Sequence, residues 1–149
     1  MTGVDVPWLS DYGFEISRGF HALKVWMTLK ENGTAKYGRL IQQNIDQAQY
    51  LSDLVTANPK LELAMPVSLN IVNFRYVIPG AVTSSLNILN KEIEIELQEQ
   101  GIAVSSIVSI RDKNYLHVAI TNHRSKREAF DLLVQEVIRI GDTLQKKQI

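Results

Sequence analysis

Apolar residues recur along the first third of the chain with the period of an α-helix. One run begins at Ser17 and stops at Asn32-Gly33, and a second begins at Thr34 and stops at Asn58-Pro59. Asn-Gly is a good helix stop, because both residues tolerate the left-handed backbone that closes a last turn. In the second run the apolar positions form one stripe of Leu40, Ile41, Ile45, Ala48, Leu51, Leu54 and Val55. The pattern therefore predicts two successive helical runs.

Four shorter segments have the composition of β-strands, and they occur as two pairs. Residues 60–64 and 69–77 form the first pair. The longer of these strands is rich in β-branched and aromatic residues, namely Ile71, Val72, Phe74 and Tyr76. Residues 102–110 and 115–121 flank the polar stretch Arg111-Asp112-Lys113-Asn114, so the second pair predicts a hairpin.

The segment NKEIEIELQEQG, residues 90–101, fits two structures. Its alternation of Glu and Ile from Glu92 to Glu96 is typical of a strand. Over a wider window, however, apolar residues recur at intervals of three, four and four, at Leu86, Leu89, Ile93 and Leu97. Gly101 then supplies a helix stop. The length of the pattern and its glycine favour a helix.

A last helix is predicted from Ser125 to Gly141. Glu128 lies three residues after Ser125, which is the spacing of a capping box. The apolar positions of this helix are Phe130, Leu133, Val134, Val137 and Ile138. The element order is then a long helix, two strands, a helix, two strands and a helix. It predicts an α+β fold with an antiparallel sheet of about four strands, helices packed on one face and a long helix in front.

Composition and charge exclude several classes of protein. The chain has 149 residues and no cysteine, which excludes a disulfide framework, a thiolate nucleophile and a Cys-ligated zinc site. Sixteen basic residues balance sixteen acidic ones, so we expect neither nucleic acid nor membrane as a partner. The N-terminus lacks the features of a signal peptide, and no stretch approaches the roughly 20 apolar residues of a spanning helix. We therefore expect a cytoplasmic protein.

Residues that support acid–base or covalent chemistry are few. Of the three histidines, His117 and His123 flank the end of the last strand, where a zinc or catalytic role competes with simple packing or solvent exposure. Ser17 at a helix N-terminus, beside Arg18, offers backbone N–H groups to a phosphate, although most such serines only cap the helix. Lys24 forms a Schiff base only if it is buried, and at the edge of an amphipathic helix it more often stays solvated.

The segment ISRGFHALKVWMTLKENG resembles the pyridoxal-phosphate (PLP)-dependent amino-acid decarboxylases of the aromatic-amino-acid and glutamate decarboxylase group. In that family a Ser-Arg or Gly-Arg pair leads into a helix with the pattern F-x-A/S-L-K-x-W. The matching residues here are Ser17, Arg18, Phe20, Ala22, Leu23, Lys24 and Trp26. The resemblance continues through GRLIQQNIDQAQYLSDLV, LNIVNFRY and YLHVAITNHRSKREAFDLL, and so covers nearly the whole chain in order.

The resemblance implies a division of the chain and a set of site residues. Residues 1–32 match the end of the family's large PLP-binding domain, and residues 33–149 match its C-terminal small domain, in the fold-type I architecture. The family's Schiff-base lysine lies in an upstream His-Lys dipeptide, which this sequence lacks, so Lys24 is not the cofactor lysine. Ser17, with Arg18, matches a small residue that approaches the cofactor phosphate across the dimer interface of relatives.

His117 departs from the family pattern. It occupies a place where relatives commonly carry an arginine that pairs with the substrate carboxylate. An imidazole does not reproduce a permanently charged, bidentate guanidinium, so carboxylate binding is either lost or pH-dependent. Gly19 and His21 also replace residues that are commonly basic in the family.

Two hypotheses for function follow. In the first, the chain is the C-terminal portion of a PLP-dependent carboxy-lyase, inactive alone, which supports active-site closure and dimerisation. It then needs a large PLP-binding domain or an upstream polypeptide, forms a homo-oligomer, and does not bind PLP tightly by itself. This hypothesis predicts an exposed apolar patch around Phe20, Leu23 and Trp26. In the second, the chain is a non-enzymatic α+β module for small-molecule binding or dimerisation.

Overall fold

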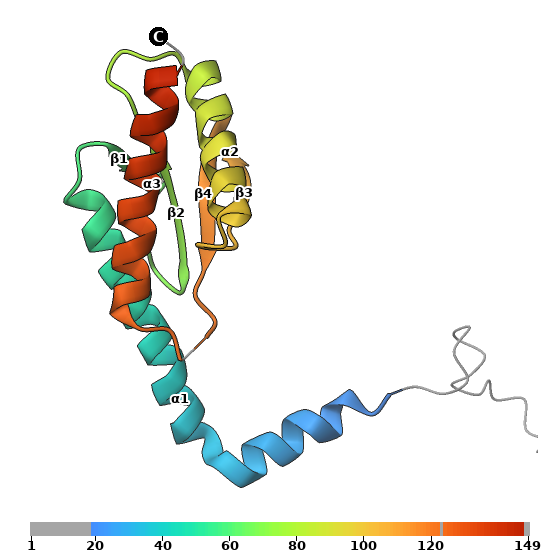
Figure 1. The fold of residues 1–149 in the computed structure, drawn as a ribbon. Coiled ribbons are helices and arrows are strands. Elements are labelled where there is room, and N and C mark those ends of the chain that lie inside the picture. The colour runs from blue at the N-terminus through green and yellow to red at the C-terminus, as the bar shows by residue number, and fades with distance from the viewer. Residues whose placement is uncertain (1–18, 123, 148–149) are drawn as a thin grey trace, which may run out of the picture. The chain divides into compact units, whose positions relative to one another are not determined.

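A computed structural model of the protein describes residues 19–122 and 124–147, with the side chain of Lys147 excepted (Figure 1). The elements in chain order are α1 (His21–Thr56), β1 (Leu61–Leu63), β2 (Ile71–Tyr76), α2 (Thr83–Glu99), β3 (Ser106–Ile110), β4 (Lys113–Ala119) and α3 (Arg127–Lys147). The chain divides into two compact units, Met1–Tyr37 and Gly38–Ile149. The second unit holds the whole sheet.

Helix α1 contains the break that Asn32-Gly33 predicts. Gly33 leaves the helical conformation, with φ of 72° and ψ of 156°, and the chain resumes the helix directly after it. A φ in this range is accessible to glycine without the steric cost that a Cβ atom imposes. Within the first unit, Thr28 Oγ1 donates to Lys24 O at 2.5 Å and Asn32 Nδ2 donates to Thr28 O at 3.1 Å. Both are local bonds along one helix.

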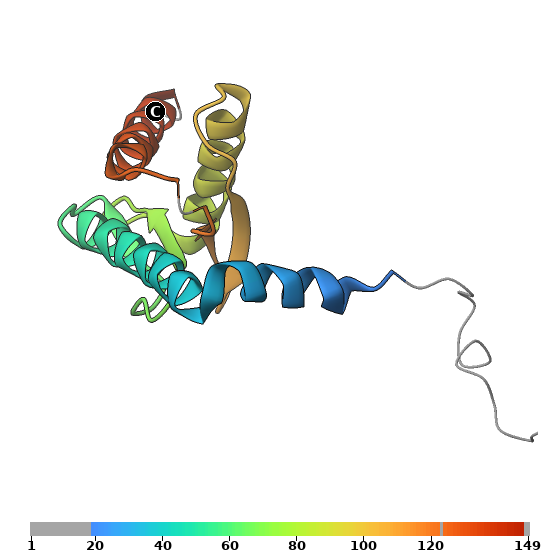
Figure 2. The ribbon, with the colours of Figure 1, turned by 90° about the horizontal axis from the view of Figure 1, so that it is seen from below.

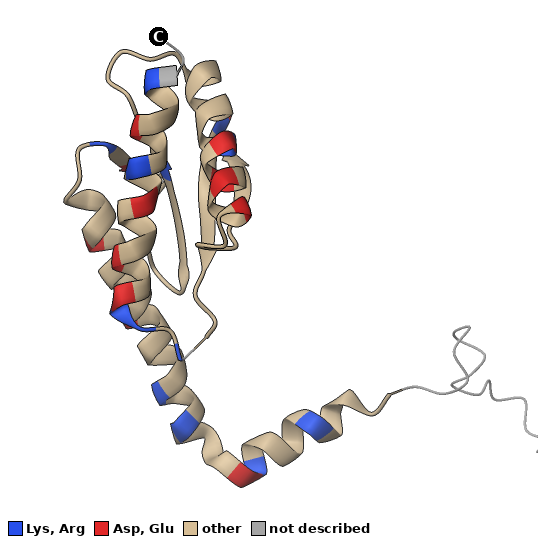
Figure 3. Ribbon diagram, viewed as in Figure 1, with Lys and Arg blue, Asp and Glu red and all other residues tan. Residues whose placement is uncertain are grey.

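The second unit confirms the predicted α+β fold. Its sheet has the strand order β1-β2-β4-β3, and every neighbouring pair is antiparallel. Helices α2 and α3 lie side by side over one face of this sheet, α2 along β4 and α3 along β2 (Figures 1 and 2). The acidic residues of α2 lie along that helix (Figure 3), and Ile93 and Leu97 on its other side are fully buried.

Alternation along the strands decides which side chains enter the core. Val72, Phe74 and Tyr76 of β2 are at most 1% exposed and belong to one buried cluster with Leu116 of β4. The same cluster takes residues from all three helices, among them Ala48, Leu51, Val55, Leu89, Ile93, Phe130 and Val137. The later residues of the apolar stripe predicted for the second run of α1 therefore contribute to the core, whereas Ile41 near its start is 58% exposed.

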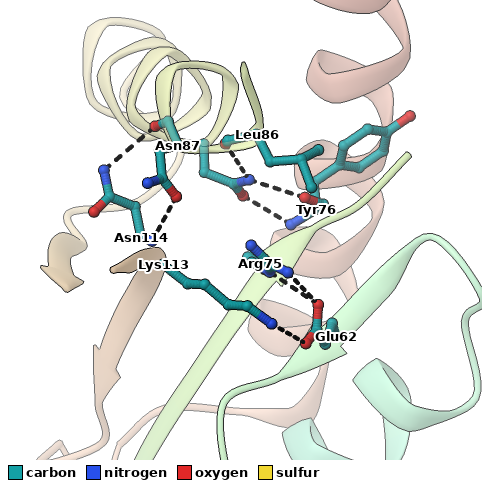
Figure 4. A network of polar contacts seen from close by, with 8 residues as sticks. Glu62, Arg75, Tyr76, Leu86, Asn87, Lys113 and Asn114 are labelled. Atoms are coloured by element: carbon teal, nitrogen blue, oxygen red, sulfur yellow. Dashed lines mark hydrogen bonds and ion pairs between the residues drawn. The ribbon is translucent and has the colours of Figure 1, made fainter. Parts of the chain in front are cut away.

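Asn90 of α2 connects that helix to β2 inside the core. Its side chain is fully buried, its Oδ1 accepts from Tyr76 N at 2.7 Å, and its Nδ2 donates to Tyr76 O and Leu86 O, both at 2.8 Å (Figure 4). An amide is stable in such a place only when its donors and acceptor are paired. Asn90 thereby fixes the helix against the strand at one register.

The predicted end of α3 at Gly141 is wrong, since the helix continues to Lys147. Gly141 instead permits a close approach. A Cβ atom built on it would lie 2.7 Å from Cδ2 and Cε2 of the Tyr76 ring. The helix also begins at Arg127 rather than at Ser125. Because glycine serves both as a helix stop and as a close-packing residue, the sequence alone did not separate the two roles.

The hairpin turn is tighter than the predicted four-residue stretch. β3 ends at Ile110 and β4 begins at Lys113, so only Arg111 and Asp112 connect them, with φ of 51° and 62°. Two positive φ angles are the mark of a type I′ turn, whose twist matches that of the flanking strands. The segment 90–101 is helical as predicted, and Gly101 follows α2 with φ of 67°.

Candidate functional site

The candidate site lies on the face of the sheet opposite α2 and α3. Asn114 of β4 points toward α2, where its backbone N donates to Asn87 Oδ1 at 2.8 Å (Figure 4). Because side chains alternate along a strand, Tyr115 and His117 lie on the other face. The strand register pairs Asn73 with His117 and Glu62 with Arg75. Polar and charged side chains of three neighbouring strands thus share the face away from α2.

His117 forms a pair with Asn73 on the neighbouring strand. The His117 Nδ1 atom lies 2.8 Å from Asn73 Oδ1, and both side chains are half-buried. An amide oxygen only accepts hydrogen bonds, so Nδ1 carries the proton and the neutral ring keeps a lone pair on Nε2. An ionised carboxylate only accepts hydrogen bonds, so a residue that binds it must supply a hydrogen-bond donor. His117 therefore offers one at Nε2 only in its protonated, imidazolium form.

Arg75 is the most buried charged residue of the sheet and is held by Glu62. Only 4% of Arg75 is exposed. Its Nε and Nη2 donate to Glu62 Oε2 at 2.9 and 2.6 Å, and Lys113 Nζ lies 3.7 Å from Glu62 Oε1 (Figure 4). Arg75 also stacks over Tyr115, with Cζ 5.3 Å from the ring centroid. One guanidinium nitrogen, Nη1, is buried without a partner.

Burial and the neighbouring charges shift the pKa of the Tyr115 phenol. Burial first, and then the carboxylate of Glu62, raise the pKa of the Tyr115 phenol, while Arg75 and Arg111 act in the opposite direction. The phenol therefore stays protonated at neutral pH. Its ring serves as a neutral surface on which the Arg75 guanidinium is stacked.

The structure places only part of the sequence-predicted site. Ser17, Arg18 and His123 lie outside the described residues, so the phosphate contact remains a prediction. His117 is described, and its substrate role remains a prediction too. Gly19 and His21, which replace basic residues of the family, are exposed.

Lys24 does not have the surroundings of a lysine that binds PLP covalently. A lysine that binds PLP covalently is activated by desolvation or by a neighbouring cation, whereas Lys24 is exposed. No group of three or more His, Asp or Glu side chains within residues 19–122 and 124–147 is arranged to hold a metal ion. We therefore derive no reaction step through either group in this chain.

Sequence reasoning missed Arg75, Glu62 and Tyr115. A signal for Arg75 was present, because Asn73 and Arg75 alternate with the apolar residues Val72, Phe74 and Tyr76 in the segment IVNFRY. Such alternation assigns the two polar side chains to one face of a strand. Their partners on β1 and β4 depend on strand register, which the sequence does not reveal.

Comparison with known proteins defines the class. A family profile described as the pyridoxal-dependent decarboxylase conserved domain matches residues 5–77. An aromatic-L-amino-acid decarboxylase of Bacillus atrophaeus is 33% identical over 132 residues, which are 87% of this chain and 27% of the relative. An L-2,4-diaminobutyrate decarboxylase of Acinetobacter baumannii is 30% identical over 105 residues, or 70% of this chain and 21% of the relative.

Solved structures show the same fold. A crystal structure of Oryza sativa TDC with PLP and tryptamine has a TM-score of 0.80 at 21% identity, covering 91% of this chain and 29% of that one. The glutamate decarboxylase domain of a Vibrio parahaemolyticus diaminobutyrate-pyruvate transaminase and L-2,4-diaminobutyrate decarboxylase has a TM-score of 0.76 at 26% identity, covering 90% and 28%.

These matches confirm the resemblance: the chain belongs to the pyridoxal-dependent decarboxylase family. It spans about a quarter of the length of the curated relatives it matches. Within the described residues, no helix is both long enough and apolar enough to cross a membrane.

Proposed function

We propose that this chain is the C-terminal portion of a PLP-dependent amino-acid decarboxylase and supplies the small α+β domain of the enzyme. One observation carries the proposal. The match to the Bacillus atrophaeus decarboxylase extends over 87% of this chain but only 27% of the relative. In the complete enzyme, PLP supplies the electron sink for loss of the substrate's α-carboxylate, and that cofactor is anchored on a large domain or a separate upstream polypeptide.

The exposed apolar residues of the first unit support this assignment. Phe20 is 70% exposed and Trp26 is 58% exposed, and Leu23 is also exposed. Val25, Met27 and Leu29 of the same helix are also exposed. Such a concentration of exposed apolar side chains is typical of an interaction surface. We assign it to the large domain, with dimerisation of the complete enzyme as a further part of the proposal.

His117 is proposed to face the carboxylate of the amino-acid substrate. Because Asn73 occupies Nδ1, the imidazolium form supplies the Nε2–H donor for that carboxylate. A single imidazole N–H then stands where a guanidinium would offer two parallel donors, so we expect weaker binding of the carboxylate than an arginine gives. An arginine at the same position would keep its charge at every working pH.

A chimera tests this function. The segment of the Bacillus atrophaeus decarboxylase that aligns with this chain is replaced by the chain, and carbon dioxide release is measured against pH with an aromatic amino acid. We expect activity that requires the upstream part of the relative. His117→Arg should lower KM, because it restores a bidentate donor, and His117→Ala should raise KM.

The isolated chain supplies the complementary measurement. The purified chain is mixed with PLP, reduced with borohydride and weighed as an intact protein. We expect no saturable one-to-one lysine adduct. Stoichiometric labelling of one lysine would mean that this chain holds its own cofactor site, and it would overturn the assignment as a dependent portion.

A further inference from the structure

A cleft lies beside the Arg75–Glu62 pair, entirely within the second unit. It is formed by the end of β1, by the following residues Ala64, Met65 and Pro66, and by the β3–β4 hairpin from Ile110 to Tyr115. Its volume is about 510 Å³, within the range of roughly 300–1,000 Å³ that is typical of small-molecule sites. His117 does not line it, so the cleft is distinct from the proposed substrate contact.

The charges around the cleft do not cancel. Arg111 and Lys113 line it, Arg75 stacks on the lining residue Tyr115, and Glu62 is the one carboxylate among the lining residues. Both hydrogen bonds between Arg75 and Glu62 use the Oε2 atom. Lys113 Nζ lies 3.7 Å from Oε1, which is longer than a hydrogen bond. Arg75 and Lys113 therefore share one carboxylate, Arg111 adds a third positive charge at the cleft, and Lys113 keeps donors available to a ligand.

Arg75 adds a second observation about the charge next to the cleft. Only 4% of the residue is exposed, and its Nη1 atom is buried without a partner. Arg75 does not line the cleft itself, but it lies against the lining residue Tyr115. A buried guanidinium with an unpaired nitrogen is costly unless further negative charge compensates it.

The wall of the cleft also has an apolar part. Met65, Pro66, Ile110 and the Tyr115 ring line it together with the charged groups. A cleft lined by cations together with apolar and aromatic groups suits an anionic group attached to a small apolar body. Arg111, in the left-handed region with φ of 51°, is held at the tip of a two-residue turn.

We propose that this cleft binds a small molecule through an oxyanion, a carboxylate or a phosphate, held by Arg111 and Lys113. The apolar body of the ligand packs on Met65, Pro66 and Tyr115. Glu62 fixes Arg75 against the Tyr115 ring, so that part of the wall is in place before the ligand arrives.

Titration of the isotope-labelled full chain tests the proposal by NMR at constant ionic strength. The probes are benzoate and phenyl phosphate, and the neutral benzamide is the control ligand. We expect saturable shifts confined to residues 62–66 and 110–115, with a Kd on the order of 1 mM for one or both anions. Benzoate binding identifies a carboxylate site and phenyl phosphate binding a phosphate site.

Two matched variants decide the result. Arg111→Gln with Lys113→Gln should weaken binding about tenfold or more. Lys24→Gln with Lys91→Gln removes the same charge at two exposed positions outside the cleft and should leave Kd unchanged. Equal weakening in both variants, binding of benzamide as tight as benzoate, or shifts that never saturate would each overturn the proposal. Far-UV circular dichroism confirms that both variants are folded.

Discussion

Gly141→Ala tests whether α3 is seated on the Tyr76 ring. In an open helix this change stabilises a protein, because alanine is the better helix former by about 1 kcal/mol. Here the new Cβ atom would lie 2.7 Å from two ring carbons, well inside an ordinary contact of about 3.5–4.0 Å. The ring has little freedom to move, since Tyr76 is 1% exposed and its hydroxyl donates to Asp142 Oδ1 at 2.6 Å.

The expected magnitude follows from the two opposing effects. Overpacking a well-packed core costs about 1–3 kcal/mol, and a ring fixed at both ends places this site toward the upper limit. Subtracting the helix-propensity gain leaves a net loss of about 1–2 kcal/mol in the free energy of unfolding. Gly38→Ala is the matched control, because Gly38 lies in α1 and a Cβ atom there meets nothing within 4 Å.

Urea unfolding followed by far-UV circular dichroism measures both variants against the parent chain. We expect the midpoint of Gly141→Ala to fall and that of Gly38→Ala to rise by the equivalent of about 0.5–1 kcal/mol, with unchanged m-values. If Gly141→Ala were stabilised as much as Gly38→Ala, the close contact between α3 and Tyr76 would not exist in solution, and the explanation for the continued helix would fail.

Three further predictions use the same unfolding assay. Asn90→Leu should cost about 2–4 kcal/mol, because it strands the buried N–H and C=O of Tyr76; a neutral result would contradict the paired amide. Lys60 and then Tyr76 lower the pKa of Asp142, so Asp142→Asn should be less stable than the parent at neutral pH. This difference should begin to shrink near the ordinary carboxyl pKa of 3.8 and vanish once the pH lies below the lowered pKa of the folded state. Asp112→Gly should gain about 0.5–1 kcal/mol by relieving a positive φ; a loss of stability would contradict the two-residue turn.

Hydrophobic periodicity predicted the elements well because burial itself follows that periodicity. Leu51 and Val55, at the end of the first apolar stripe, are buried in the core. Leu89 and Ile93 are buried as well, on the helix that contains residues 90–101, for which the sequence fitted both a strand and a helix. In that segment the helical spacing outweighed a local alternation of Glu and Ile, since the four apolar positions all lie on one helix face. The residues at which helices and strands begin and end were less predictable.

Local sequence does not reveal what a distant residue places next to a glycine or a serine. Gly141 leaves room for the ring of Tyr76, which lies 65 positions earlier in the chain. Ser125 and Glu128 have capping-box spacing, yet α3 begins at Arg127. The Arg75–Glu62 pair likewise depends on the register of β1 against β2, which is set by burial of Leu61 and Leu63 on the opposite face.

The two faces of the sheet differ in how completely their buried polar groups are hydrogen-bonded, and this difference bears on which face is functional. Toward α2, Asn90 pairs all of its buried groups, and Asn114 bonds to Asn87 through its backbone N. On the other face, Arg75 Nη1 is the one buried side-chain nitrogen or oxygen of the described strands that has no partner.

Asn44 Oδ1, Gln47 Oε1 and Ser105 Oγ are also buried without a partner, so the unpaired nitrogen of Arg75 points to a function only together with the additional cations near it. Under the proposed function, these cations face either a ligand or another part of the complete enzyme. The anion titration separates these two cases, because only a ligand site binds benzoate or phenyl phosphate in the chain by itself.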